Sequence, residues 1–323
     1  MAVPMLFDME NGRDPMSKTR GLRVALVLGA GGPLGHAYHA GVLRALEHAV
    51  GWDARLSDLV VGTSAGAQVG ALLRAGLSGA DLAARVSGEP LRPEVAEIAQ
   101  HYVRPDHRHP HPDHPRRRAP AAPRFLLHAL SRPSLLRPGR LASALLPEGR
   151  VRLDAQAHGL RNVFGHRWPD RALWITAVHL DSGERVAFGA PGAPPIDVGT
   201  AVTCSGAVPG VHVPVHWEGR RYVDGGMASA THVDLVADQP VDLVIVSSPL
   251  SMFTAMRALL FAEMRRAGLS APVVAFEPKD GALAAMGNNP MAIERSADVT
   301  RAAFETTLRD LESPEKKRHL SKL

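Results

Sequence analysis

The apolar positions of the chain follow two patterns, continuous β-favouring runs and runs at helical spacing. Residues 22–28 (LRVALVL) form a continuous apolar run, as expected of a strand buried on both faces, and lead into the glycine-rich stretch GAGGPLG. Apolar residues then recur at helical spacing over 38–50. Residues 58–62 (DLVVG) predict a second buried strand, and residues 65–77 predict a helix that stops at Gly76.

The rest of the chain continues this alternation. A strand at 171–180, the turn DSGE and a partner strand at 185–189 predict a hairpin, and a second hairpin over 213–226 turns at Glu218-Gly219. The remaining predicted elements are a short helix at 199–211 that breaks at Pro209, a strand at 241–248, a helix at 252–267, a strand at 272–278 and a closing helix at 291–312. This alternation predicts an α/β fold with a mostly parallel sheet and helices on both sides.

The chain divides into three segments by composition. Residues 1–20 predict a flexible leader, residues 21–312 a single domain, and residues 313–323 a basic tail. Within the domain, prolines recur through 104–123 and prevent a regular helix or a central strand. We therefore expect an exposed loop or disordered insertion there.

Composition indicates the cellular compartment in which the protein is expected. Of the 323 residues, 45% are hydrophobic, which is ordinary for a globular protein, and the net charge is +5. The lone Cys204 excludes an intramolecular disulfide, no secretory signal is apparent, and no apolar run is long enough to span a bilayer. These features predict a cytoplasmic protein. The basic runs Arg116–Arg118 and Lys316–Arg318 leave peripheral contact with an anionic membrane open, and nothing resembles a nucleic-acid module.

A serine occupies the centre of a Gly-x-Ser-x-Gly motif between a predicted strand and a predicted helix. Ser64 lies between Gly62 and Gly66 in GTSAG, which is the context that a nucleophile elbow requires. Such a turn exposes the hydroxyl for nucleophilic attack. The alternative is a tight turn in which a small serine caps the helix. We predict Ser64 as the nucleophile of an acyl transfer.

The glycine-rich loop offers candidate donors for an oxyanion. Backbone N–H groups at the start of a helix favour negative charge. Pro33 lacks an N–H, so Gly31 and Gly32 are the better donors, and the amide of Ala65 can supplement them. The alternative is a dinucleotide-binding loop, but the glycine spacing G-x-G-x-x-x-G is one residue longer than the Rossmann fingerprint.

None of the 16 histidines makes an attractive base for the serine. In an α/β-hydrolase the triad follows the chain order Ser, then Asp or Glu, then His. The best acidic candidate is Asp224, and the histidines downstream of it are His232, which is too close to it in sequence, and His319, which lies in the basic tail.

Four histidines lie in the proline-rich insertion: His107, His109, His111 and His114. They could bind zinc, but alternating prolines set their spacing and no cysteine joins them, which favours a flexible loop. We predict no metal site.

Three motifs in order resemble those of the patatin-like phospholipase family. They are the loop and helix LGAGGPLGHAYHAGVLRAL, the elbow at Ser64, and DGG at residues 224–226. The stretches CSGAVPGVHVPVHWEGRRYVDGG and WITAVHLDSGE also resemble the family. The resemblance covers roughly residues 22–250 well and the C-terminal part loosely. Three ordered motifs are more specific than any one of them.

The resemblance implies a three-layer α/β/α sandwich and a Ser-Asp dyad without a catalytic histidine. Asp224 would take the Ser64 proton as general base and later activate water, and partial burial would raise its pKa. Gly225 and Gly226 would let the turn bring the carboxylate close to the elbow. Gly35 would support the glycine loop in the same way that Gly62 and Gly66 support the elbow.

The chain departs from the family pattern in the glycine loop. The family usually carries Arg or Lys where this chain has Leu34, and three consecutive glycines where this chain has Ala30, Gly31 and Gly32. Backbone donors remain, but the cationic contact is absent. The sequence therefore does not assign an anionic phospholipid head group.

Taken together, the motifs predict a serine acylhydrolase that cleaves carboxylic ester bonds of lipids, of the phospholipase, lipase or esterase type, without a cofactor. Two alternatives stay open. One is a nucleotide-binding oxidoreductase that uses GAGGPLG as a phosphate loop. The other is a catalytically degenerate patatin-like protein with a lipid-binding or regulatory role.

Overall fold

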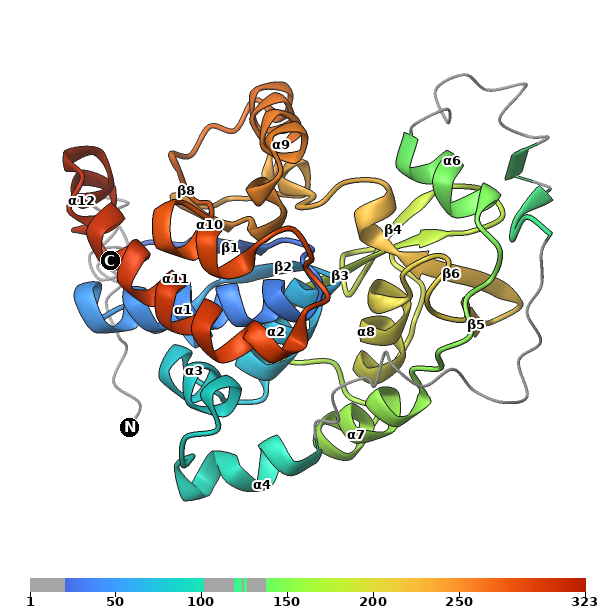
Figure 1. Ribbon diagram of the computed structural model, residues 1–323, viewed down its shortest axis with the longest axis horizontal. Coiled ribbons are helices and arrows are strands. Elements are labelled where there is room, and N and C mark those ends of the chain that lie inside the picture. The colour runs from blue at the N-terminus through green and yellow to red at the C-terminus, as the bar shows by residue number, and fades with distance from the viewer. Residues whose placement is uncertain (1–20, 102–118, 124, 127–137) are drawn as a thin grey trace, which may run out of the picture.

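The computed structural model describes residues 21–101, 119–123, 125–126 and 138–323 (Figure 1). The predicted leader at 1–20 lies outside the described residues, as do the part of the predicted insertion before residue 119 and its four histidines. The described residues form one sheet with helices on both faces. The predicted α/β class and three-layer α/β/α arrangement are confirmed.

Eight strands form a mixed, mostly parallel sheet within the described residues. They are β1 (Val24–Leu28), β2 (Leu59–Thr63), β3 (Ala172–His179), β4 (Arg185–Phe188), β5 (Val215–Trp217), β6 (Arg220–Asp224), β7 (Leu243–Ser247) and β8 (Val273–Phe276). The strand order is β5-β6-β3-β2-β1-β7-β8, with β4 beside β3. Neighbours from β3 through β2, β1 and β7 to β8 are parallel, and the two predicted hairpins, β3-β4 and β5-β6, supply antiparallel pairs.

Helices cover both faces of the sheet. They are α1 (Gly32–Val50), α2 (Ala65–Arg74), α3 (Gly79–Ser87), α4 (Pro93–His101), α6 (Pro138–Leu145), α7 (Asp154–Phe164), α8 (Val198–Gly206), α9 (Thr254–Ala267), α10 (Asp280–Met286), α11 (Ser296–Leu311) and α12 (Pro314–Leu320). Alternate strand residues face opposite layers, so Leu26 packs with α1, α2 and α11, whereas Val27 packs with α9. In Figure 1, α1 and α11 run side by side.

Several helix boundaries differ from the predicted ones, and the short helix predicted at 199–211 ends at Gly206, before Pro209. Helix α1 begins at Gly32 instead of residue 38, because Pro33 fits the first turn of a helix, where its missing N–H costs nothing. The closing helix was predicted from residue 291 but begins at Ser296, and a short 3-10 turn precedes it.

The basic tail contains α12, whose Leu320 is buried in the core. No helix among the described residues has the length and apolar character needed to cross a membrane.

Strands β2 and β6 meet end to end along one edge of β3. Thr63, the last residue of β2, pairs with Thr176, and Asp224, the last residue of β6, pairs with the adjacent Ala177. Both of these β3 residues also pair with β4. A strand has only two edges, so β2 and β6 share the edge opposite β4. Because β2 runs parallel to β3 and β6 runs antiparallel, their carboxyl ends converge, and Ser64 follows directly.

Helix α2 packs directly on β1 through Gly66. A Cβ at this position would lie 1.9 Å from the carbonyl oxygen of Leu28, so the packing leaves no space for a side chain. We expect Gly66→Ala to lower the free energy of unfolding by about 3 kcal/mol or more, because backbone must move to relieve the overlap. Urea unfolding measures this loss.

The matched control is Gly281→Ala in α10, where the nearest atom to a new Cβ is Oγ1 of Thr306 at 3.8 Å. This variant is expected to be neutral or more stable by up to about 1 kcal/mol. A Gly66→Ala protein with the wild-type unfolding midpoint would contradict the close packing of α2 on β1.

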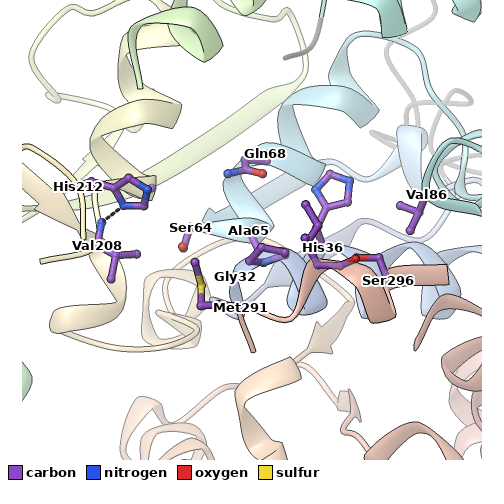
Figure 2. A pocket seen from close by; sticks show the side chains of 13 residues that line it. Gly32, His36, Ser64, Ala65, Gln68, Val86, Val208, His212, Met291 and Ser296 are labelled. Carbon is purple, nitrogen blue, oxygen red and sulfur yellow. Dashed lines mark hydrogen bonds between the residues drawn. The ribbon is translucent and has the colours of Figure 1, made fainter. Parts of the chain in front are cut away.

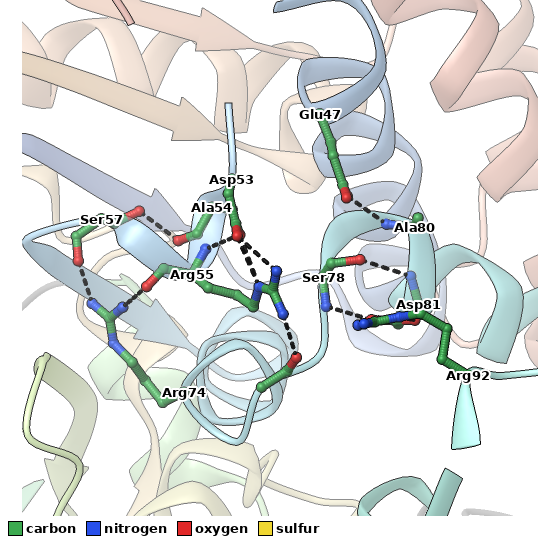
Figure 3. Close-up of polar contacts among 11 residues, drawn as sticks. Glu47, Asp53, Ala54, Arg55, Ser57, Arg74, Ser78, Ala80, Asp81 and Arg92 are labelled. Atoms are coloured by element: carbon green, nitrogen blue, oxygen red, sulfur yellow. Dashed lines mark hydrogen bonds and ion pairs between the residues drawn. The ribbon is translucent and has the colours of Figure 1, made fainter. Parts of the chain in front are cut away.

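A polar network anchors the opposite end of β2 (Figure 3). Arg74, at the end of α2, donates hydrogen bonds to the carbonyl oxygens of Arg55 and Ser57 at 2.8 Å and of Ala172 at 2.9 Å. Burial lowers the pKa of Arg74 to about 10, which leaves it charged at neutral pH. This guanidinium ties the end of α2 to the beginnings of β2 and β3, away from Ser64.

Candidate active site

Ser64 occupies the sharp turn between β2 and α2. Its backbone, with φ 54° and ψ −114°, lies in a region that non-glycine residues rarely adopt. The backbone N–H of Ser64 donates to Oγ of Ser205 on α8 at 2.8 Å, which helps to hold this conformation. A Cβ at Gly62 would lie 2.6 Å from the Cα of Ala67, so strand and helix approach too closely for a side chain. The strand, turn and helix expected of a nucleophile elbow are all present.

Asp224 lies beside Ser64 at the end of β6. The carboxylate accepts a hydrogen bond from the backbone N–H of Gly226 at 2.7 Å, and the Ser64 side chain lies close enough to lower the pKa of the carboxyl. Asp224 is buried, and desolvation raises the pKa of its carboxyl to about 6, although the interactions with Ser64 and with the N–H of Gly226 act in the opposite direction. The structure therefore brings the two predicted dyad residues into contact.

The DGG turn is tightly packed against β3. A Cβ at Gly225 would lie 2.6 Å from the carbonyl oxygen of Thr176, so this position cannot carry a side chain. A Cβ at Gly226 would lie 3.0 Å from Oδ1 of Asp224, which is tight. The predicted role of both glycines fits these contacts. At Gly35, by contrast, a Cβ would make only ordinary contacts of 3.4 Å or more, so the packing there is less demanding.

The glycine loop presents backbone N–H groups next to the elbow. Among the described residues, no acceptor bonds the N–H of Gly31, Gly32 or Ala65. The next available N–H, that of Leu34, donates to the carbonyl oxygen of Pro290 at 3.1 Å and is therefore occupied. The start of α1 thus leaves the predicted oxyanion donors available, at the positive end of the helix dipole.

A pocket of about 550 Å³, including its open mouth, lies over Ser64 (Figure 2). Its apolar lining consists of Pro33, Ala65, Val86, Val208, Met291 and Ile293. Its other lining residues are Gly32, His36, Gln68, Gly206, His212 and Ser296. Figure 2 shows Ser64 and Met291 near the middle of the pocket, with His212 and Val208 toward one end and Val86 toward the other. The serine hydroxyl therefore faces a mainly apolar slot.

Comparison with known proteins assigns this chain to a family. A family model described as patatin-like phospholipase matches residues 26–237, which include the glycine loop, the elbow and the DGG turn. The chain belongs to the patatin-like phospholipase family. Membership in a phospholipase family supports lipid acylhydrolase activity in general terms and gives no support to a nucleotide-binding oxidoreductase.

Three solved structures are similar to this patatin-like chain. VipD from Legionella pneumophila is 14% identical, with 91% of this chain and 67% of VipD covered and a TM-score of 0.44. The type III effector protein ExoU is 20% identical, with coverages of 92% and 53% and a TM-score of 0.37. The ExoU-SpcU complex from Pseudomonas aeruginosa matches at 17% identity, with coverages of 94% and 52% and a TM-score of 0.38. The chain spans about half the length of the ExoU chains.

The departure from the patatin-like pattern at Leu34 has a structural counterpart. The Leu34 side chain is fully buried in the core cluster beneath α1. The Leu34 side chain contributes packing, and its backbone N–H donates to the carbonyl oxygen of Pro290. The residue therefore does not place a cation beside the pocket.

Two polar residues beside the candidate dyad have contacts that the sequence does not predict. Ser205 lies in a short apolar helix, and its hydroxyl accepts a hydrogen bond from the N–H of Ser64. The sequence presents His232 only as an unattractive base. Its ring is buried, and Nε2 donates to the carbonyl oxygen of Gly225 at 2.9 Å, so it holds the DGG turn. No local sequence signal distinguishes these residues, because the partner of Ser205 is distant in the chain and the partner of His232 is a backbone carbonyl, which any residue carries.

Proposed function

We propose that this patatin-like protein is a serine acylhydrolase that cleaves carboxylic ester bonds of lipids. The observation that carries the proposal is the interaction of the Ser64 side chain with the buried Asp224 carboxylate, beside an apolar pocket. A serine hydroxyl needs a base to become nucleophilic, and Asp224 is the group in contact with it. The family match supports the same class of reaction.

In the proposed acylation step, Oγ of Ser64 attacks the ester carbonyl carbon while its proton moves to the Asp224 carboxylate. Collapse of the tetrahedral intermediate breaks the carbon–oxygen bond, and the leaving alcohol takes the proton from Asp224. Water then repeats the sequence on the acyl-enzyme, giving its proton to Asp224 and releasing the carboxylic acid as Ser64 is reprotonated. Burial makes Asp224 a stronger base than an exposed carboxylate.

The negative charge of the tetrahedral intermediate requires donors. In this proposal the N–H groups of Gly31 and Gly32 supply them, with the N–H of Ala65 as a third candidate. Fixed donors in a poorly hydrated site need little reorganisation as charge develops, and each is worth about 10² to 10³ in rate. The mechanism uses only groups of this chain.

The apolar part of the pocket suits an acyl chain. Val86, Val208 and Met291 offer hydrocarbon surface on both sides of Ser64. An ester panel with short, medium and long acyl chains, together with phospholipid vesicles, tests the substrate class. Hydrolysis of lipid esters supports the proposal. A folded protein that is inert toward every ester and toward a fluorophosphonate would instead favour a lipid-binding or regulatory role.

The pH dependence of ester hydrolysis is expected to follow the protonation state of Asp224, the proposed base. Asp224 must be ionised to accept a proton, and its carboxyl pKa is raised to about 6. We expect kcat/KM to be flat above this value and to fall about tenfold per pH unit below it. Initial rates on a short neutral ester, measured on enzyme that stays folded across the range, give this profile. An activity that is unchanged well below pH 6 would contradict the role of Asp224.

A further inference from the structure

Another buried histidine, His39, links the start of the glycine loop to the end of β7. It lies on α1 and is fully buried. Its Nε2 lies 2.8 Å from the carbonyl oxygen of Gly29, and its Nδ1 lies 2.8 Å from Oγ of Ser247 at the end of β7. The His39 ring, which lies about two turns into α1, therefore joins the start of the glycine loop to the end of β7.

The contacts fix the protonation of the His39 ring. A carbonyl oxygen can only accept, so Nε2 carries the proton and donates it to Gly29. Burial lowers the pKa of His39 to about 4, so the ring is neutral above that pH. In a neutral ring Nδ1 is an acceptor, and the hydroxyl of Ser247 donates to it. One tautomer satisfies both partners.

These bonds complete the anchoring of the chain just before the oxyanion donors. The N–H of Gly29 donates to the carbonyl oxygen of Ser247 at 2.9 Å, and its carbonyl oxygen is held by His39. The N–H of Ala30 donates to the carbonyl oxygen of Ala230 at 2.7 Å. The following N–H groups, those of residues 31 and 32, have no acceptor among the described residues. Their direction is set by the anchored residues before them and by α1 after them.

We propose that His39 is a positioning residue that holds the backbone donors of Gly31 and Gly32 in place through the carbonyl oxygen of Gly29. Glycines restrain the backbone least, so a loop that contains two of them needs an external anchor. The inference rests on the proposed function, because it assigns these N–H groups to the transition state. His39 itself does not touch the substrate, since it does not line the pocket.

Two polar substitutions of His39 test this positioning role without leaving the space of its ring empty. The amide nitrogen of glutamine can reach the position of Nε2, whereas the shorter asparagine reaches only that of Nδ1. We expect His39→Gln to keep kcat within about threefold of wild type, and His39→Asn to lower kcat by about 10- to 100-fold with KM within about twofold. His48→Gln, at an exposed position on the same helix, is the matched control and is expected to be unchanged.

Rates are normalised to active sites titrated with a fluorophosphonate, because a loss of folded protein lowers the titre and leaves kcat per titrated site unchanged. The acid limb of the pH profile is expected to stay in place in His39→Gln. Equal kcat per site in the asparagine variant, the glutamine variant and the wild type would overturn the proposal. A shifted acid limb in His39→Gln would also overturn it, because His39 would then act as the base.

Ser247→Ala provides a second route if the His39 variants do not fold. It removes the donor to Nδ1 and leaves the ring in place, so we expect a smaller loss in kcat, of a few fold. A wild-type kcat in Ser247→Ala would then count against the anchor. Failure of the wild-type enzyme to react with the probe or with any ester would instead contradict the proposed function itself, and the two failures are distinguishable.

Discussion

Ser64→Ala is expected to remove ester hydrolysis, with kcat lowered by at least about 10³-fold. Alanine has no hydroxyl to form the acyl-enzyme, and the remaining pocket and backbone donors can only bind the ester and polarise its carbonyl. The Ser64 backbone already adopts its strained conformation through contacts of its main chain, including the N–H bonded to Ser205. The fold and the pocket should therefore survive the substitution.

Ser57→Ala is the matched control for this prediction. Ser57 is also buried, near the beginning of β2, and among the residues that the structure describes its hydroxyl bonds only the carbonyl oxygen of Ala54, at 2.7 Å. It should retain wild-type kcat per folded molecule. Rates with a chromogenic ester, and circular dichroism of both variants, provide the comparison. Substantial turnover by a folded Ser64→Ala protein would contradict the nucleophile assignment.

Asp224→Asn is expected to lower the rate of ester hydrolysis without unfolding the protein. The amide has nearly the shape of the carboxylate and can still accept from the N–H of Gly226, but it cannot take the Ser64 proton. Loss of a general base costs about 10² to 10⁴ in rate. We therefore expect kcat to fall by at least about 10²-fold while the protein remains folded.

The same variant should be more stable than wild type above pH 6. The carboxyl pKa of Asp224 rises from 3.8 to about 6 on folding, so the folded state binds the proton more tightly. The wild type therefore loses stability as the pH rises from 3.8 to about 6, by up to roughly 3 kcal/mol. Asparagine does not titrate, so the variant does not share this loss.

Urea unfolding of both proteins at several pH values measures the difference. We expect a gain of about 1–3 kcal/mol for Asp224→Asn above pH 6, and a small difference near pH 4, where both side chains are neutral. All other titrating groups are common to the two proteins and cancel. A variant that is less stable than wild type above pH 6 would contradict the burial of a charged Asp224.

The main elements could be predicted from the sequence because each is a local pattern. The buried strands at the start of the chain, both hairpins and the elbow at Ser64 correspond to runs of apolar residues bounded by glycine or turn residues. The start of α1 was placed too late, because glycine and proline obscure helical periodicity in the first turn. Local patterns therefore indicated the elements better than their ends.

The contact between Ser64 and Asp224 could not be derived from spacing alone. It depends on two strands that converge on one edge of β3, and strand pairing between distant segments leaves no local signal. The resemblance to the patatin-like family supplied the partner, and DGG by itself would indicate only a turn. The supporting contacts of His39 and His232 have a different cause: each ring bonds a backbone carbonyl, which every residue carries, so no residue type marks the partner.

The most direct test of the account is to locate a covalent adduct on the wild-type enzyme. The protein is treated with a fluorophosphonate, digested, and analysed by mass spectrometry of its peptides. A phosphonyl group on the peptide that contains Ser64, formed more slowly in Asp224→Asn and absent from Ser64→Ala, is the predicted result. An active enzyme whose adduct lies on another residue, or that hydrolyses esters while Ser64 stays unmodified and dispensable, would contradict it.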